Sequence, residues 1–472
     1  MLRRSAWTLA LIFWACAGDG ESDGSGGAAG LGGTSGSGGG SGAGGSSEDS
    51  GADVSEDSDG AGEDVGSDAS NDAADAGSSV TMSEIHQQHR FISGAMFGGW
   101  GPHLGHLVRA PASSGAIDAL WFVDDVCAQT AADGPVCDVN HDHTLGYYER
   151  DGAGWHHRGD VTLPGMVQQN TATVMSKGEL QTFGIDVGAH VIRECKYAAK
   201  TGPGGCATLP FTLGANANYI GAAVSPSGAR LVWWTGVVDG GGGTFHYVVD
   251  YGGGWNGPRS GSAAGYNDAS YANVAFGGDS ATRVTFHGQL VSGLAPNWGF
   301  LGAVGYGDLA TTDAVAWMDE LVPVASDAVV STNDVWTDPK TGDTHLVART
   351  AGGSAAYFHR PKAGTWSAAT FTWPATYRAR FVPSGTRLGL VYGPNQGNLA
   401  YRIANEADRP AGSPIAWGDL LEQTVALPAG FGAVLAIYPE TTAYQTSSVS
   451  NLNVALVGKG KEHVVLHVGL EL

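Results

Sequence analysis

One phrase recurs from about residue 100 to the end of the chain, and it constrains the fold more than any other feature. Each copy has a few polar residues, a glycine-containing turn and a strongly apolar run, as in "SPSGARLVWWTG" and "PSGTRLGLVYG". A period of about fifty residues, built of strands rather than helices, is typical of stacked sheets of the propeller type. The turn glycines are Gly115, Gly178, Gly228, Gly278, Gly342, Gly385 and Gly460.

The rest of each unit also reads as sheet. A strand led by Tyr or Phe follows, and then a turn leads to a tryptophan, as in "YVVDYGGGW". We expect these outer tryptophans to pack between neighbouring sheets. The sequence therefore predicts an all-β chain with a single β-propeller of seven four-stranded blades. Eight blades remain an alternative, because the last interval between turn glycines is 75 residues long, and six would result if one weak copy is only a hairpin. The tryptophans are Trp155, Trp255, Trp317, Trp366 and Trp417.

The last copy ends the chain soon after the predicted second strand of its blade, so we expect the final blade to lack its outer strands in chain order. The stretch "HQQHRFISGAM" (residues 86–96) is placed to supply an outer strand to that blade. Such a closure joins the two ends of the domain and removes an exposed sheet edge.

Before the repeats, composition divides the chain into two further parts. Residues 1–16 have a basic start and an apolar run too short to span a bilayer, which indicates a secretory signal peptide. Ordinary cleavage at "ACA" and lipidation of Cys16 after a lipobox-like end are both consistent with it. Residues 17–79 are mostly Gly, Ser, Ala and acids, and we expect a disordered linker. Residues 80–472 form the predicted propeller domain, so the expected location is the outer membrane, as a lipoprotein, or the extracellular space.

The charge of the folded part bears on its partners. The whole chain carries a formal charge of −22. Setting aside the 14 acids of residues 17–79, together with Arg3 and Arg4, leaves 32 acids against 22 bases. An acidic domain without a basic run does not favour nucleic acid or an anionic membrane surface. We expect a monomer whose partner is a polysaccharide or a surface protein, and which meets the membrane only through an N-terminal lipid anchor.

Four cysteines follow Cys16, in two close pairs. An exported chain meets an oxidising compartment, so we predict the disulfides Cys127–Cys137 and Cys195–Cys206, the economical choice among three connectivities.

Chain order also predicts where a binding site would lie. In a four-stranded meander, the loop between strands two and three lies at the same end as the loop joining one blade to the next. Amide, carboxylate and tyrosine groups around that end would form many directed hydrogen bonds with a polyhydroxylated ligand, although such residues also cap ordinary turns. The candidates are His103, His106, Asp124, His141, His143, Gln169, Asn170, Asn218, Tyr219, Asn267, Asp268, Asn333 and Asp334, and Gln168, Asn216 and Tyr271 belong to the same phrases.

The loop "VCAQTAADGPVCDVNHDH" allows three interpretations. His141 and His143 could bind a metal with Asp138, His103 or His106, although the i, i+2 spacing is not diagnostic. A histidine with a tyrosine such as Tyr219 could act as a base in an elimination. The third interpretation is a disulfide-stapled surface loop, and we therefore expect no firm cofactor.

The phrases "DPKTGDTHLVART", "SPSGARLVWW" and Tyr…Gly-x-Trp resemble those of sialidase-like, BNR-type bacterial propellers over about residues 84–472. The resemblance implies a propeller fold. The family's Asp-box order Ser-x-Asp-x-Gly-x-x-Trp is approached around Asp338–Gly342 but not matched, and no FRIP phrase supplies a sialidase arginine. Sialidase activity is therefore not carried over.

The first expectation for function is a surface or secreted binding module for a polysaccharide or a protein partner, with no enzyme activity required. A carbohydrate-active enzyme is the alternative, either a hydrolase with carboxylates such as Asp124 or Asp268 or a lyase with His and Tyr. A third expectation is a docking platform of the envelope, with apolar mouth residues such as Leu294 and Trp298.

Overall fold

In the computed structural model, the residues from Ser78 to Leu472 form one compact unit. The described residues are 79–88, 106–115, 118–126, 142–165, 167–214, 217–225, 227–236, 243–263, 270–276, 282–289, 298–306, 316–321, 333–350, 354–374, 377–394, 397–432, 434–440, 451–458 and 463–471.

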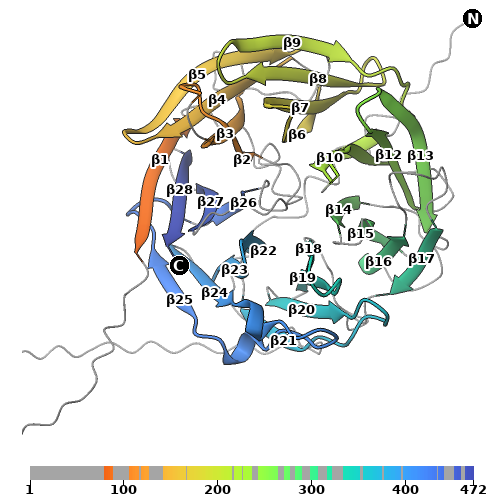
Figure 1. Cartoon of the computed structure of the whole chain (residues 1–472), viewed down its shortest axis with the longest axis vertical. Helices are drawn as coiled ribbons and strands as arrows, with labels where there is room; N and C mark the ends of the chain where they lie inside the picture. Colours follow the sequence, from red (N-terminus) through yellow and green to blue (C-terminus); the bar gives the residue numbers. More distant parts are fainter. Residues whose placement is uncertain are drawn as a thin grey trace, which may run out of the picture. The chain divides into compact units, whose positions relative to one another are not determined.

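The described strands form seven antiparallel sheets of four strands (Figure 1). Blades one to three are β2 (Leu107–Pro111), β3 (Asp118–Val126), β4 (His143–Asp151), β5 (Gly154–Leu163); β6 (Val167–Ser176), β7 (Glu179–Asp186), β8 (Val191–Ala198), β9 (Gly202–Thr208); β10 (Ala217–Val224), β11 (Arg230–Gly236), β12 (Gly243–Asp250), β13 (Trp255–Ala263). Blades four to six are β14 (Ser270–Phe276), β15 (Thr282–Gln289), β16 (Trp298–Tyr306), β17 (Ala316–Leu321); β18 (Asn333–Thr337), β19 (Thr344–Thr350), β20 (Ser354–Arg360), β21 (Phe371–Pro374); β22 (Tyr377–Ser384), β23 (Arg387–Gly393), β24 (Asn398–Ala404), β25 (Gln423–Ala426). Blade seven is β26 (Val434–Pro439), β27 (Asn451–Gly458), β28 (His463–Glu471) and β1 (Val80–Gln88).

The first strand of each blade in chain order is its innermost strand, and these strands contact one another around the centre (Figure 1). A parallel bridge between Leu107 and Glu440 joins blade one to blade seven and closes the ring. Two short 3-10 helices, η2 (Glu406–Asp408) and η3 (Trp417–Asp419), lie between β24 and β25. The predicted all-β propeller of four-stranded blades is confirmed.

An N-terminal strand closes the last blade, but it begins earlier than the sequence predicts. β1 pairs antiparallel with β28, from Val80 opposite Leu470 to Gln88 opposite His463. It overlaps the predicted stretch 86–96 only at residues 86–88, and the remainder of that stretch lies outside the described residues.

The last copy of the repeat forms the second hairpin of its blade and not, as the sequence predicts, the first. Gly460 falls between β27 and β28, the second and third strands of its blade, whereas each earlier turn glycine falls between strands one and two. Blade seven therefore lacks only its fourth strand in chain order, and this offset lengthens the final glycine interval. Every strand between Gly385 and Gly460 belongs to blade six or seven, so the described strands there form no eighth blade.

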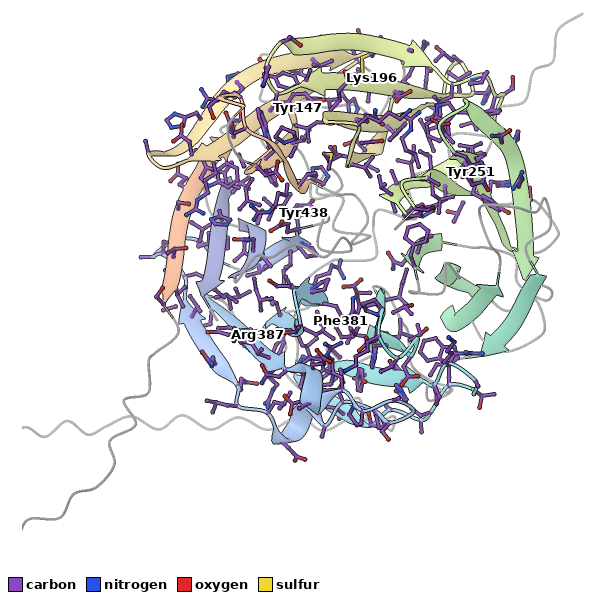
Figure 2. All side chains as sticks on the ribbon, in the orientation of Figure 1. Tyr147, Lys196, Tyr251, Phe381, Arg387 and Tyr438 are labelled. Atoms are coloured by element: carbon purple, nitrogen blue, oxygen red, sulfur yellow. A yellow bond between two sulfur atoms is a disulfide. The ribbon has the colours of Figure 1, made fainter. Side chains whose placement is uncertain are left out.

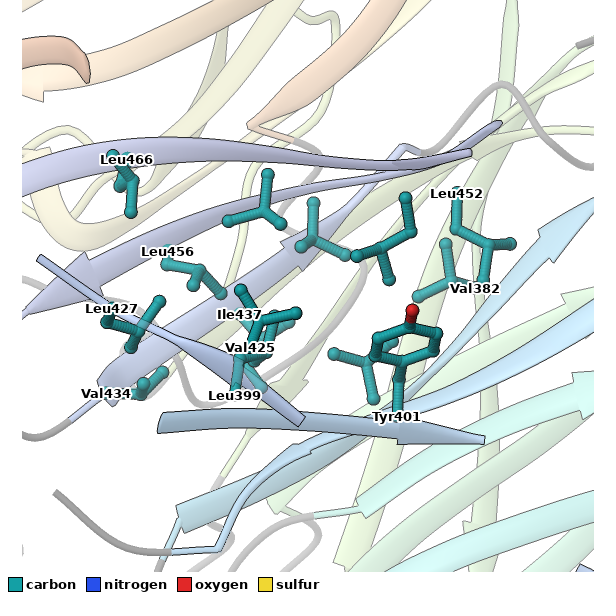
Figure 3. Close-up of a cluster of buried hydrophobic side chains, with 14 of the residues drawn as sticks. Val382, Leu399, Tyr401, Val425, Leu427, Val434, Ile437, Leu452, Leu456 and Leu466 are labelled. Carbon is teal, nitrogen blue, oxygen red and sulfur yellow. The ribbon is translucent and has the colours of Figure 1, made fainter. Parts of the chain in front are cut away.

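The core is a series of apolar layers between blades. One layer joins blades six and seven, and Figure 3 shows its aliphatic side chains interdigitating around Tyr401 and Ile437. The second strands β3, β7, β19, β23 and β27 each contribute to two such layers, which explains their continuous apolar runs. The buried members of this layer are Val382, Val391, Leu399, Tyr401, Val425, Leu427, Phe431, Val434, Ile437, Leu452, Val454, Leu456, Leu466, Val468 and Leu470.

The outer tryptophans pack against a neighbouring blade, as predicted. The indole N–H of Trp155 donates to Ser83 of β1, in blade seven, at 3.1 Å. Trp255 meets Phe183 of blade two edge-on, with ring centroids 5.7 Å apart. Trp366 and Trp417 lie in apolar clusters shared with the blade before their own. The side chain of Trp317 lies outside the described residues.

A series of hydrogen bonds crosses blade seven, from its outer strand β1 to the end of its inner strand β26. The Ser83 hydroxyl, which accepts from Trp155, lies 3.5 Å from Nδ1 of His467. On the other side of the imidazole, Nε2 lies 3.1 Å from Oδ1 of Asn453. The Asn453 amide donates to Glu440 at 2.9 Å.

The direction of these hydrogen bonds follows from Glu440, the acceptor at the inner end of the series. Because the Glu440 carboxylate only accepts, Asn453 presents its amide nitrogen to Glu440 and its oxygen to His467. Nε2 of His467 therefore carries the proton, and Nδ1 accepts from Ser83. Burial, with two arginines nearby, lowers the pKa of His467 to about 3, so the imidazole stays neutral. Arg109 of blade one donates to Glu440 at 2.6 Å and connects the closed blade to its neighbour.

One of the two predicted disulfides lies in the described residues. Cys195 of β8 and Cys206 of β9 are bonded and directly opposite one another in the ladder, which confirms that pairing. The predicted Cys127–Cys137 bond lies outside the described residues.

Candidate functional site

The entry ends of the inner strands share an irregular backbone. Five of the seven inner strands shift register against their second strand within the first residues of the pairing. We call this end of the propeller the bulged rim. The residues inside the five shifts are 168–170 in β6, 219–220 in β10, 271–272 in β14, 378 in β22 and 435 in β26.

The opposite ends of the same strand pairs are regular. β6 pairs with β7 without interruption up to Ser176 opposite Glu179, and β22 with β23 up to Ser384 opposite Arg387. The β6–β7 turn contains Lys177 and Gly178, both with positive φ, as a tight hairpin turn requires. Because a bulge disrupts the ladder locally and re-aims side chains, the end at which the bulges concentrate is the candidate binding site.

The rim includes many of the residues predicted as candidates. Gln169, Asn170 and Tyr219 lie inside bulges, Asn218 pairs immediately before one, and Asn333 and Asp334 begin β18. The structure describes the backbone of these residues and, among their side chains, that of Asp334. His103, His141, Asn267 and Asp268 lie outside the described residues, as do Leu294, Asn216 and the tip of the 124–143 loop.

Asp334 is a buried carboxyl at the rim. It is 2% exposed, and its Oδ2 accepts from the backbone N–H of Phe381 in β22, at 2.7 Å, so it joins blades five and six. Burial raises its pKa to about 7, against the opposing influence of the Arg380 guanidinium and of two backbone N–H groups. Asp334 therefore changes protonation near neutral pH at the junction of two inner strands. Figure 2 shows Phe381 and Tyr438 on the inner side of the ring.

The first blade brings three candidates to the same end. His106 precedes β2, and its Nδ1 lies 2.6 Å from the Val123 carbonyl, which only accepts, so Nδ1 carries the proton. Its ring packs on Tyr438, with centroids 4.5 Å apart. Asp124 and His143, on β3 and β4, are 6% and 4% exposed. These side chains are built into the blade wall rather than displayed on a loop.

Asp124 also affects a tyrosine of the same blade. Burial, followed by the carboxylates of Asp124 and Asp160, raises the pKa of Tyr148. The Tyr148 ring lies over Gly146, where an added Cβ would come within 3.1 Å of it. Gly146 is paired with both Asp124 and Asp160, so three strands meet at this phenol. A neutral Tyr148 is a hydrogen-bond donor beside two carboxylates, not a base.

Among the described side chains, no group of three or more His, Cys, Asp or Glu is placed to hold a metal ion. His103, Asp138 and His141, which the metal interpretation of the loop would use, lie outside the described residues. Within the described part of the chain, no helix is long and apolar enough to cross a membrane.

Sequence reasoning missed the bulges and the polar networks between blades. Arg378 and Leu435 were not candidates, yet each is the extra residue of a shift. One signal was present: Gly221 directly follows the bulge in β10, and a glycine inside a strand often marks one.

No family model matches the chain, and no curated protein matches its sequence. Among solved structures, it is similar to the polysaccharide lyase Uly1, at 12% identity and a TM-score of 0.48, covering 75% of this chain and 88% of the other. It is also similar to the BP39L lectin from Burkholderia pseudomallei, at 14% identity and a TM-score of 0.47, covering 77% and 95%. The Hadza microbial sialidase Hz136 matches at 11% identity and a TM-score of 0.41, covering 70% and 73%. Similarities this distant leave function to be argued from the chain's own residues.

Proposed function

We propose that this chain is a binding module that takes a polysaccharide at the bulged rim. The observation that carries the proposal is the concentration of five register shifts at one end of the inner strands. A bulge releases backbone N–H and C=O groups from the ladder, which then become available to a ligand.

The residue types inside the bulges support the same ligand class. Five of the nine residues inside the shifts, Gln168, Gln169, Asn170, Tyr219 and Tyr271, are uncharged donors and acceptors, and one of the nine, Arg378, is charged. A polyhydroxylated ligand needs many such partners. An anionic ligand needs cations instead, and in this domain acids outnumber bases.

Binding rather than catalysis accounts for the described polar groups of the rim. Nδ1 of His106 is bonded to a backbone carbonyl, and Asp334 accepts from the backbone of the next blade. Both groups position strands, and a general acid or base must instead reach the substrate.

A binding screen with and without chelator tests the proposal. We expect the purified chain to be retarded in native gels by at least one of the neutral polymers dextran, xylan and laminarin, more strongly than by the polyanions alginate and pectate, and with equal strength in EDTA. We also expect no release of reducing ends or unsaturated sugars. Product release would show an enzyme instead, and a chain retarded by none of these polymers, nor by a broader glycan array, would contradict the proposal.

We further propose that the chain is exported and lipid-anchored at Cys16, on the basis of the basic, apolar start and the long Gly/Ser/Asp segment that follows it. In a bacterial host, Cys16→Ser is expected to move the chain from the membrane pellet to the soluble fraction and to abolish incorporation of labelled palmitate. A wild-type chain that is already soluble and unlabelled would contradict the anchor.

A further inference from the structure

Blades three and four begin their inner strands with the same bulge. In β10, two residues, Tyr219 and Ile220, face the single residue Trp234, because the pairs on either side are Asn218 with Thr235 and Gly221 with Trp233. In β14, Tyr271 and Ala272 face one residue in the same way, between the pairs Ser270–His287 and Asn273–Thr285. A tyrosine thus occupies the first bulge position in both blades.

Buried neighbours hold the β10 bulge in place. Ile220 is 2% exposed and belongs to the apolar layer between blades two and three. The indole of Trp233 lies over Gly221, where an added Cβ would come within 2.3 Å of the ring. The backbone after the bulge is therefore fixed against a buried ring, which reduces the ordering cost of binding.

The β14 bulge is followed by a similarly buried strand. Asn273 and Val274 are 0% and 1% exposed, and Ala275 lies in the apolar cluster with Trp366 of the next blade. Both bulges are thus short segments at the ends of anchored strands.

The two bulges belong to neighbouring inner strands. β10 and β14 contact one another, and both begin at the rim. Tyr219 and Tyr271 lie on different blades, so each tyrosine is a separate point of contact. Two such positions suit a chain of sugars better than a single sugar.

We propose that Tyr219 and Tyr271 are paired aromatic contacts for one linear polysaccharide, each taking the apolar C–H face of a sugar ring. Tyrosine suits this role because its ring stacks while its hydroxyl remains available to sugar hydroxyls. This inference rests on the proposed function and deepens it by naming the part of the rim that binds.

The test compares tyrosine variants that differ in position. Tyr219→Ala and Tyr271→Ala are each expected to weaken retardation by the bound polysaccharide about tenfold, and the double variant about a hundredfold. Phenylalanine at either position should keep binding within about threefold, because the stacking ring is retained. Tyr251→Ala is the matched control, because Tyr251 is 39% exposed in the turn between β12 and β13, at the opposite end of the blade.

The outcomes separate this inference from the proposed function. If wild type binds and the Tyr219 and Tyr271 variants bind as Tyr251→Ala does, the paired contacts are wrong and the polysaccharide binds elsewhere. A wild-type chain that binds no polymer overturns the proposed function and this inference with it. Thermal melts within about 2 °C of wild type show that a variant still folds.

Discussion

Deleting residues 79–88 is expected to lower the free energy of unfolding by about 4 kcal/mol or more. The deletion removes the burial of Ile85, worth about 2 kcal/mol, and exposes the edge of β28. It also removes Ser83 and with it the hydrogen bonds to Trp155 and His467, each worth about 1 kcal/mol. Guanidinium denaturation of the purified chain measures the change.

Two controls isolate the effect of the closing strand. Deletion of residues 17–76, which stops short of β1, should leave the denaturation midpoint unchanged. Adding the peptide VTMSEIHQQ to the shortened chain should restore part of the loss, because the peptide can pair with the exposed edge of β28. A chain without residues 79–88 that unfolds at the wild-type midpoint would contradict ring closure by β1.

Arg230→Met is expected to destabilise the junction of blades two and three by about 3–5 kcal/mol. Nη1 of Arg230 donates to Gln181 at 2.6 Å and to Glu194 at 2.7 Å, both in blade two, while its other nitrogens bond to Asp250 of its own blade. The guanidinium also lies 4.5 Å from the ring centre of Trp255. The substitution leaves the buried Asp250 without its cation and Glu194 with only the exposed Lys196, 3.9 Å away, and that costs far more than losing an exposed pair.

A surface ion pair provides the comparison. Lys340 pairs with Glu406, and their side chains are 67% and 42% exposed, so Lys340→Met should leave the denaturation midpoint almost unchanged. Adding Glu194→Gln and Asp250→Asn to Arg230→Met should recover part of the loss, because the uncompensated charges are then gone. Equal effects of Arg230→Met and Lys340→Met on the denaturation midpoint would refute the buried network.

The repeat was readable because each blade repeats a turn glycine and an apolar strand. The repeated sequence does not indicate whether it forms the first or the second hairpin of a blade. This ambiguity explains why the hairpin at Gly460 was predicted incorrectly. In an antiparallel meander, both the first and the second hairpin can carry a glycine turn before a buried strand. Only the hydrogen-bonded partner of β28, which is β1, resolves the assignment.

The end that carries the candidate site could be predicted because chain order alone decides which loops share an end. The bulges could not be predicted, because a bulge is a difference in the number of residues between two paired strands, and the pairing is known only once the chain is folded. The β10 shift needs Tyr219 and Ile220 to be counted against Trp234 across the ladder.

The ion pairs and hydrogen bonds between blades could not be predicted from the sequence, for a related reason. Arg230 and Glu194 are 36 residues apart in sequence. Arg230 is the single charge of β11, whereas Glu194 shares β8 with Arg193 and Lys196, so the sequence offers it nearer cations. Their partnership depends on the angle between two blades, which no local pattern encodes. The same holds for Glu440 and Arg109, which are separated by almost the whole domain.

Amide hydrogen exchange of the purified chain, with and without the polysaccharide that retards it most, tests the central claim most directly. Bound polysaccharide should slow exchange in peptides covering residues 217–222 and 270–274, where the backbone leaves the ladder, and leave the turn at residues 251–254 unchanged. Slowed exchange confined to that turn, or to the outer strands, while the polysaccharide is bound would contradict binding at the bulged rim.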